Sequence, residues 1–329
     1  MGWIGKLFSG EEEAAKSGPV STPKAAPAAG AAQPASAAEI DAVYFRWLAA
    51  VGPQVASAPT EQLIVDELTR LAQSPVAGAA LVPRVPAIIP QLMRTLRDDD
   101  MNAAELSRQL SQDLVLVAEV YREANRPCYR PRYHNSPPIN SVEGAIMLLG
   151  QNGMRMLLAR VAFRPIMSMQ SGALAKRTAP LIWRQSEHCA MAGSLLAPSL
   201  RANAFESYLA GLMANVGLVV AFRVIDQMHA GDALPQSDAF IVSLFGQAQT
   251  LSARIAELWE FPETVNGAID LAGRPDAPPL AQTLALSDRV SKLRMLVDAT
   301  LVAADDPFVV SGLGKVALAC FDKLQEDEE

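Results

Sequence analysis

The chain has 329 residues, of which half are apolar and 19% are charged, with a formal net charge of −7 at pH 7. Such an apolar share supports a buried core, and the negative charge argues against broad electrostatic attraction to nucleic acid. The three cysteines are far apart and form no Cys-x-x-Cys pair, so a disulfide framework or zinc knuckle has no support. We find no apolar run near the ~20 residues of a membrane span and no secretory leader, so we expect a cytoplasmic protein.

The N-terminal region differs in composition from the rest. Residues 14–39 consist mainly of Ala, Pro, Ser and Gly. A segment with so few large apolar side chains cannot bury enough surface to offset its ordering entropy, which predicts a disordered tether over residues 1–39. The apolar group Trp3, Ile4, Leu7 and Phe8 in front of it suits a docking motif, a weak membrane-surface helix or, more simply, a disordered tip.

From residue 40 onwards the apolar spacing is helical. Ile64, Leu68 and Leu71, for example, follow the i, i+4, i+7 pattern. Further helices are predicted at 142–150, 152–169, 178–198, 203–229, 238–258, 262–272, 279–299 and 307–324, with Gly or Pro falling between them. Alternating strand patterns are scarce, so the predicted fold class is all-α.

A series of short motifs follows in a fixed order along the chain. They are Val82–Pro86, Glu105–Leu116, Glu123–Arg132, Ile139–Gly150 with Met154-Arg155, Trp183–Ala190, Ala204–Gly217 and Leu258–Pro262. Together they resemble the HDOD family, the HD-related output domain of bacterial signalling proteins, over roughly residues 80–295. The resemblance implies an N-terminal helical subdomain packed on an HD-like helical bundle. We therefore expect a short helical extension at 40–80, an HDOD-like domain at 81–300 divided into 81–172 and 173–300, and a closing helix and acidic tail at 301–329.

The same resemblance identifies four positions that hold metal ligands in HD-type phosphohydrolases. Residues 208–220 resemble the segment with adjacent His and Asp ligands, and here these positions are Ala214 and Asn215. The early His position is Gln185 and the later Asp position is Asp288. Alanine has no donor atom, and an amide is a poor substitute for a carboxylate on a hard divalent ion. The sequence therefore predicts a degenerate site with no metal, no cofactor and no enzymatic activity.

Two other interpretations of this region stay open. A polar cluster of Gln185, Asn215 and Asp288 would suit a cavity for a small ligand without metal. His188 would become a ligand if it pointed into the same pocket, although a satisfied core or surface histidine is the more ordinary role.

A second candidate site lies in the segment 121–134, which is rich in Arg and Tyr. Its anion-binding candidates are Arg122, Arg126, Tyr129, Arg130 and Arg132. Guanidinium groups and aromatic faces are suited to phosphate and nucleobase binding. A loop held by its own Arg–carbonyl contacts is the favoured alternative, because the loop of the HDOD family has similar residues.

We predict a non-catalytic output or scaffold module that binds a signalling protein partner. One alternative is a phosphohydrolase or phosphodiesterase with a rearranged metal site, which Asp288→Ala would inactivate. Another is a sensor of a nucleotide or other small anionic ligand, which would stabilise the protein thermally.

Overall fold

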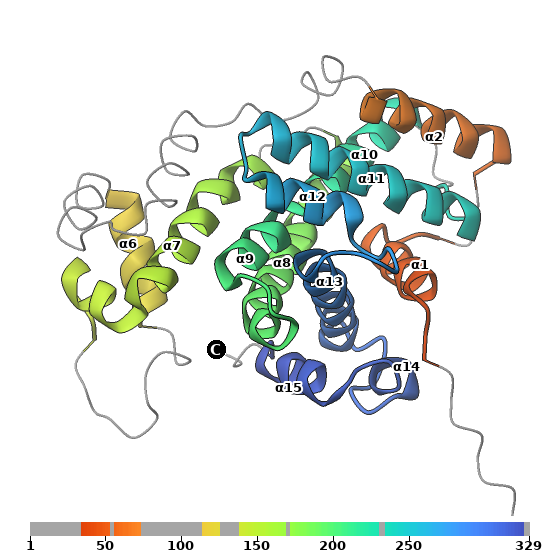
Figure 1. Cartoon of the computed structure of the whole chain (residues 1–329). Helices are drawn as coiled ribbons and strands as arrows, with labels where there is room; N and C mark the ends of the chain where they lie inside the picture. The colour runs from red at the N-terminus through yellow and green to blue at the C-terminus, as the bar shows by residue number, and fades with distance from the viewer. Residues whose placement is uncertain are drawn as a thin grey trace, which may run out of the picture. The chain divides into compact units, whose positions relative to one another are not determined.

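The computed structural model describes residues 34–52, 56–73, 114–125, 138–168, 172–229 and 234–325. Within these ranges every regular element is a helix, which confirms the all-α prediction (Figure 1). The group from Trp3 to Phe8, most of the predicted tether and the acidic residues 326–329 lie outside the described ranges.

Within the described ranges, two helices precede the region of the HDOD motifs. Helix α1 (Ala37–Leu48) begins with a capping box, in which Ser36 Oγ accepts from Glu39 N and the Glu39 carboxylate accepts from Ser36 N. The predicted tether (1–39) therefore extends too far, since Ala37 is already helical. Helix α2 (Ala58–Gln73) buries Ile64 and its periodic partners, as predicted.

Helices α6 (Leu114–Ala124) and α7 (Val142–Ser168) follow. Asn125 closes the connection between them, because its side chain donates to Ile139 O and accepts from Ile139 N, both at 2.8 Å. Helix α7 is interrupted at Gly150, which has a φ of 67°, so the two helices predicted there are separated at that glycine.

The central helices are α8 (Ala173–Leu196), α9 (Ala204–Met213), α10 (Val216–Met228), α11 (Asp238–Leu258), α12 (Glu263–Leu271) and α13 (Pro279–Asp298). The predicted single helix at 203–229 is wrong, because α9 ends before Ala214 and Asn215 leaves helical geometry, with φ −106° and ψ 5°. The break falls within the predicted metal-ligand pair.

Two glycines beside this break allow backbones to meet. A Cβ on Gly211 of α9 would lie 2.5 Å from Ala190 Cα in α8, and a Cβ on Gly217 of α10 would lie 2.0 Å from Ala248 O in α11. Neither helix pair could approach as closely with a side chain at these positions. Close packing on both sides therefore fixes the break.

The C-terminal region contains α14 (Pro307–Val310) and α15 (Lys315–Lys323) rather than the single helix predicted at 307–324. These helices cover one side of α13, where Phe321 and Leu293 share an apolar cluster with Ile40 of α1. Helix α1 thus contacts both the main core and the C-terminal cluster.

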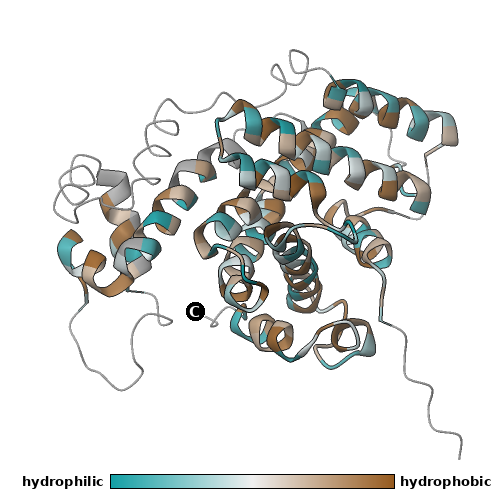
Figure 2. Ribbon diagram, viewed as in Figure 1, coloured by the Kyte–Doolittle hydropathy of each residue, from teal (hydrophilic) through white to brown (hydrophobic). Residues whose placement is uncertain are grey.

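One segment of the described chain, residues 204–228, is long and apolar enough to cross a membrane, and an 18-residue stretch within it has a mean hydropathy of 1.8. However, 89% of that stretch is buried inside the protein. The segment is the α9–α10 pair, and its apolar side chains form part of the core. Most other helices carry both hydrophobic and hydrophilic residues around their circumference (Figure 2).

Candidate functional site

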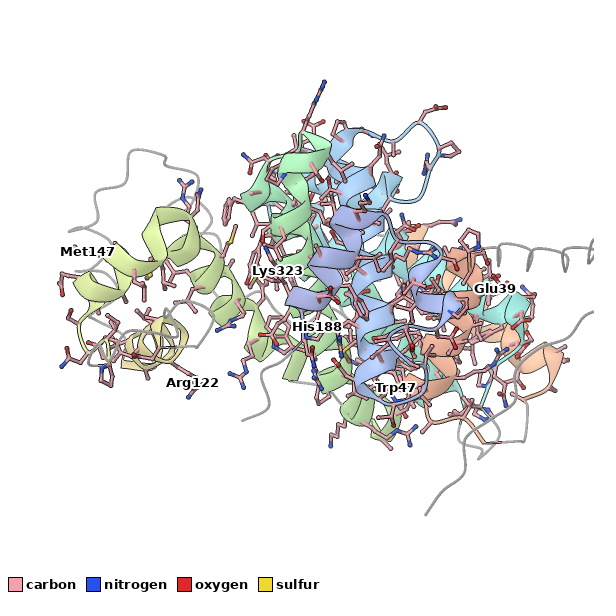
Figure 3. All side chains as sticks on the ribbon, turned by 90° about the horizontal axis from the view of Figure 1, so that it is seen from below. Glu39, Trp47, Arg122, Met147, His188 and Lys323 are labelled. Atoms are coloured by element: carbon pink, nitrogen blue, oxygen red, sulfur yellow. The ribbon has the colours of Figure 1, made fainter. Side chains whose placement is uncertain are left out.

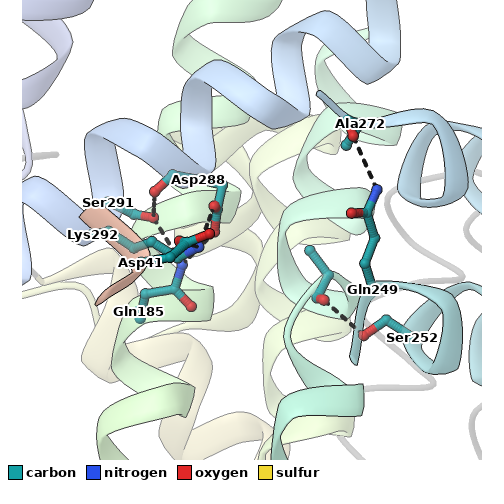
Figure 4. A network of polar contacts seen from close by, with 9 residues as sticks. Asp41, Gln185, Gln249, Ser252, Ala272, Asp288, Ser291 and Lys292 are labelled. Atoms are coloured by element: carbon teal, nitrogen blue, oxygen red, sulfur yellow. Dashed lines mark hydrogen bonds and ion pairs between the residues drawn. The ribbon is translucent and has the colours of Figure 1, made fainter. Parts of the chain in front are cut away.

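Two of the predicted site residues meet directly between α8 and α13 (Figure 4). Gln185, fully buried in α8, donates from Nε2 to Asp288 Oδ1 at 2.9 Å and to Ser291 Oγ at 3.0 Å. Ser291 Oγ donates in turn to Asp288 O at 2.9 Å. The amide of Gln185 therefore joins the two helices at the position where the family resemblance expected a metal.

A lysine occupies the centre of this arrangement. Lys292 lies one helical turn after Asp288, and its Nζ is 2.6 Å from Asp288 Oδ2 and 2.6 Å from Asp41 Oδ1 of α1. The Lys292 side chain is 5% exposed, whereas those of Asp41 and Asp288 are 20% and 29% exposed. We call Asp41, Asp288 and Lys292 the Lys292 cluster.

Aromatic rings complete the surroundings of the ammonium group. Lys292 Nζ lies 4.6 Å from the ring centroid of Phe245 and 5.9 Å from that of Tyr44. The negative face of an aromatic ring attracts a cation, more strongly where water is excluded. Two carboxylates and two rings thus surround a single buried positive charge.

The electrostatics keep this charge in place. Burial alone would lower the pKa of Lys292, but the neighbouring Asp288 and Asp41 carboxylates raise its pKa well above the ordinary value. Burial raises the pKa of Asp41, against the opposing effect of Lys292. Burial, with the charge of Asp288, also raises the pKa of the Cys189 thiol. Lys292 is therefore a cation at neutral pH.

The other two predicted positions have different surroundings. Ser252 Oγ donates to Ala214 O at 2.7 Å and accepts from Gly217 N at 2.8 Å, which satisfies two backbone groups at the helix break. Asn215 is buried, and its Nδ2 has no hydrogen-bond partner within the ranges that the structure describes. Ala214 and Asn215 bring no charge to this segment.

The residues present do not fit the divalent ion that the HD-type resemblance implies. Asp288 is the single carboxylate among the four predicted positions, and its two oxygens already contact Gln185 and Lys292. Among the described residues, no group of three or more His, Cys, Asp or Glu side chains could hold a metal ion. Such a site needs several fixed donors, and here a protonated lysine stands beside the carboxylate instead.

Two of the remaining candidates lie within the described ranges. Arg122 is an exposed residue of α6, whereas His188 is buried in α8, three residues after Gln185 and well apart from Arg122 (Figure 3). Arg126, Tyr129, Arg130 and Arg132 lie outside the described ranges. The anion-binding hypothesis therefore stays a prediction.

Neither Lys292 nor Asp41 is among the site residues predicted from the sequence. One signal was available, since Asp288 and Lys292 are an acid and a base at i, i+4 on a predicted helix. Asp41 is 251 residues away from Lys292 along the chain, and no local pattern indicates that contact.

Comparisons with known proteins agree with this fold. An HDOD domain protein of unknown function from Geobacter sulfurreducens superposes with a TM-score of 0.54 at 20% identity, over 82% of this chain and 94% of that one. A proposed metal-dependent phosphohydrolase from Shewanella amazonensis has the same TM-score at 16% identity, over 82% of this chain and 98% of its own. At these identities the similarity concerns the fold alone.

A curated relative is similar in sequence. It is an uncharacterized protein of Treponema pallidum, 23% identical over 240 residues, which are 68% of this chain. The match spans only 45% of that relative's length.

The sequence profile of the HDOD domain matches residues 82–275, more than half of the chain. The matched region includes Gln185, Ala214 and Asn215, and it ends before α13, which contributes Asp288 and Lys292. Since both the profile and the helical architecture agree, the chain belongs to the HDOD family.

Proposed function

We propose that this protein is a non-catalytic signal-transduction module of the cytoplasm that acts by binding other proteins. The observation that carries the proposal is the Lys292 ammonium, held 2.6 Å from the one carboxylate that the HD-type positions retain. A phosphohydrolase of this fold would need a divalent ion there to activate water. Membership of the HDOD family supports the signalling role.

Helix α1 adds a second argument against catalysis, because it covers the cluster. Its side chains Ile40, Tyr44, Phe45 and Leu48 are almost completely buried. Burying each such side chain contributes about 1.5–3 kcal/mol. Withdrawing α1 to admit a substrate would expose all four side chains to water, which opposes such an opening.

Polar contacts at the other end of α1 reinforce the same conclusion. Arg177 of α8 donates to Ala49 O at the C-terminus of α1, and Arg46 pairs with Asp238 at 2.6 Å. The Glu61 carboxylate of α2 accepts from Ser237 N and Ser237 Oγ. The extension is thus integrated with the bundle and does not behave as a loose lid.

A starting point for mapping a partner lies on α7. Met147 is 86% exposed, and the next residue, Leu148, is also exposed. Exposed apolar side chains that stand together mark candidate interaction sites. Replacing both by Ser tests whether this part of α7 contributes to binding.

An activity assay tests the non-catalytic part of the proposal. Purified protein is incubated with mono- and diester substrates and with Mg²⁺, Mn²⁺, Fe²⁺ or Zn²⁺ in turn. We expect no turnover above that of Asp288→Ala in any mixture. Turnover by the wild type that Asp288→Ala abolishes would reject the proposal in favour of a rearranged metal site.

The binding part needs a separate measurement. Partners captured in source cells are purified and mixed with the protein in defined ratios. We expect one of them to form a stoichiometric complex by size-exclusion chromatography and light scattering, with the same affinity for the wild type and Asp288→Asn. If no captured protein binds when purified, the scaffold function is rejected.

A further inference from the structure

The Lys292 cluster resembles a cation-binding site in which the cation is a side chain of the protein itself. Asp288 Oδ2 and Asp41 Oδ1 face the same Nζ at equal distances of 2.6 Å. Gln185, on the other side of Asp288, has a buried Oε1 without a hydrogen-bond partner in the described chain. Oxygen atoms of carboxylates and amides are also the ligands that hard divalent ions prefer.

We propose that the Lys292 ammonium is the permanent cation of this centre, in the place of a divalent ion, and that it ties helix α1 to the HDOD bundle. Asp41 precedes the region that matches the family profile, and Asp288 follows it. One positive charge therefore joins two segments on either side of the family region. The inference goes beyond the proposed function, since it would hold equally for a protein that binds a small ligand.

The charge balance explains why lysine and a metal exclude each other. Two carboxylates with one ammonium carry a net charge of −1, and partial exposure of the carboxylates moderates this charge. A divalent ion added beside the ammonium would meet strong repulsion at close range. Without the ammonium, the same two carboxylates repel each other, and a divalent ion would neutralise them completely.

Removal of Lys292 should therefore create a metal site. Lys292→Ala leaves Asp41 and Asp288 facing a space that lacks its cation, and the Gln185 amide can turn its oxygen towards that space. At a Mn²⁺ concentration about 100 times the dissociation constant, we expect the melting temperature of Lys292→Ala to rise by about 5 °C or more.

Three controls accompany this measurement. The wild type and Lys315→Ala, which loses an exposed lysine of α15, should show no Mn²⁺-dependent shift. The double variant Lys292→Ala/Asp288→Asn should lose the shift, because one of the two carboxylates is gone. A folded Lys292→Ala protein without a Mn²⁺-dependent shift, or a wild type that gains one, overturns the proposal.

If Lys292→Ala fails to fold both in the presence and in the absence of Mn²⁺, a second measurement tests the proposal. Asp41→Asn removes the charged contact between α1 and Lys292, and Asp238→Asn removes the exposed contact of Arg46 on the same helix. We expect hydrogen exchange of α1 amides to become at least tenfold faster in Asp41→Asn than in Asp238→Asn. Equal exchange rates overturn the proposal.

These results are separate from those that test the function. Phosphoester turnover by a wild type that shows no Mn²⁺-dependent shift would reject the non-catalytic function and leave the lysine cation in place. A folded Lys292→Ala variant without a Mn²⁺-dependent shift, together with a wild type that shows no turnover, would reject the lysine cation and leave the non-catalytic function in place.

Discussion

The Lys292 cluster and the helix break at 214–215 both lie at positions where the HD-type resemblance expected metal ligands, yet they are built differently. In the cluster, a carboxylate persists and a lysine neutralises it at 2.6 Å. At the break, the ligand positions are uncharged, Gly211 lets α9 approach α8, and Gly217 lets α10 approach α11. In the Lys292 cluster, the negative charge of the remaining carboxylate is balanced by the lysine. At the helix break, no ligand charge remains, and close packing of the helices takes the place of a metal site.

This difference gives each region its own sensitivity. The stability of the Lys292 cluster depends on the sum of its charges, so the loss caused by one charge-changing substitution is best compensated by a second substitution that restores the charge balance. The break depends on volume and on two backbone hydrogen bonds, so added atoms or a lost hydroxyl should be costly there.

The largest effect is expected for Lys292→Met. It leaves Asp41 and Asp288 close together without their cation, and breaking a buried ion pair in this way costs about 3–5 kcal/mol. Urea unfolding measures the loss. The neutral triple variant Lys292→Met/Asp41→Asn/Asp288→Asn should regain a large part of it. If the triple variant is as unstable as Lys292→Met, charge balance is not what the cluster provides.

A somewhat smaller loss is expected for Gly217→Ala. The new Cβ would lie 2.0 Å from Ala248 O, a backbone atom that cannot move without shifting α11, so we expect a loss of about 3 kcal/mol. Gly246→Ala on α11 is the matched control, because no atom lies within 4 Å of its Cβ, and it should gain about 0.5–1 kcal/mol. Similar unfolding midpoints for the two variants would contradict the close-packing account.

Ser252→Ala tests the hydrogen bonds of the break. It leaves Ala214 O and Gly217 N without their partner in the core, so we expect a loss of about 1–2 kcal/mol. Ser243→Ala on the same helix removes only an exposed bond to Ala239 O, and its change should stay below about 0.5 kcal/mol. Thermal unfolding compares the two. Equal losses would show that Ser252 is dispensable.

The smallest effect is expected outside both regions, at Cys320 in the C-terminal cluster. Burial raises the pKa of this thiol to about 11, so its neutral form contributes stability at and below its ordinary pKa, and the contribution is lost as the pH rises through 11. In a Cys128→Ser background, Cys320 should react with a thiol reagent at pH 8 about a hundredfold more slowly than a free cysteine. Reaction at the free rate would show that the C-terminal helices open readily.

Much of the helical architecture could be predicted, because it depends on local patterns. The spacing of Ile64, Leu68 and Leu71 placed α2, and Gly150 separated the two parts of α7. The division of 203–229 could not be predicted in the same way. Its apolar pattern has only a short polar break at Asn215, and the end of α9 there depends on contacts of Gly217 and Ala214 with Ala248 and Ser252 of α11.

The candidate site could be predicted only in part, for the same reason. The family resemblance singled out Gln185 and Asp288, and the structure brings them together at 2.9 Å. Lys292 was within reach as the i+4 partner of Asp288. Asp41 and Tyr44 come from a helix that the family motifs do not include, so only the tertiary structure shows that they complete the cluster.

The most direct test of the account is the metal content of the native protein. It is purified without chelators or metal-affinity resin, incubated with Fe²⁺, Mn²⁺, Zn²⁺ or Mg²⁺ in turn, dialysed and analysed for elements. If Lys292 takes the place of a divalent ion, we expect far less than one bound metal ion per chain in every case. One equivalent of a metal in the wild type, lost in Asp288→Asn, would contradict it.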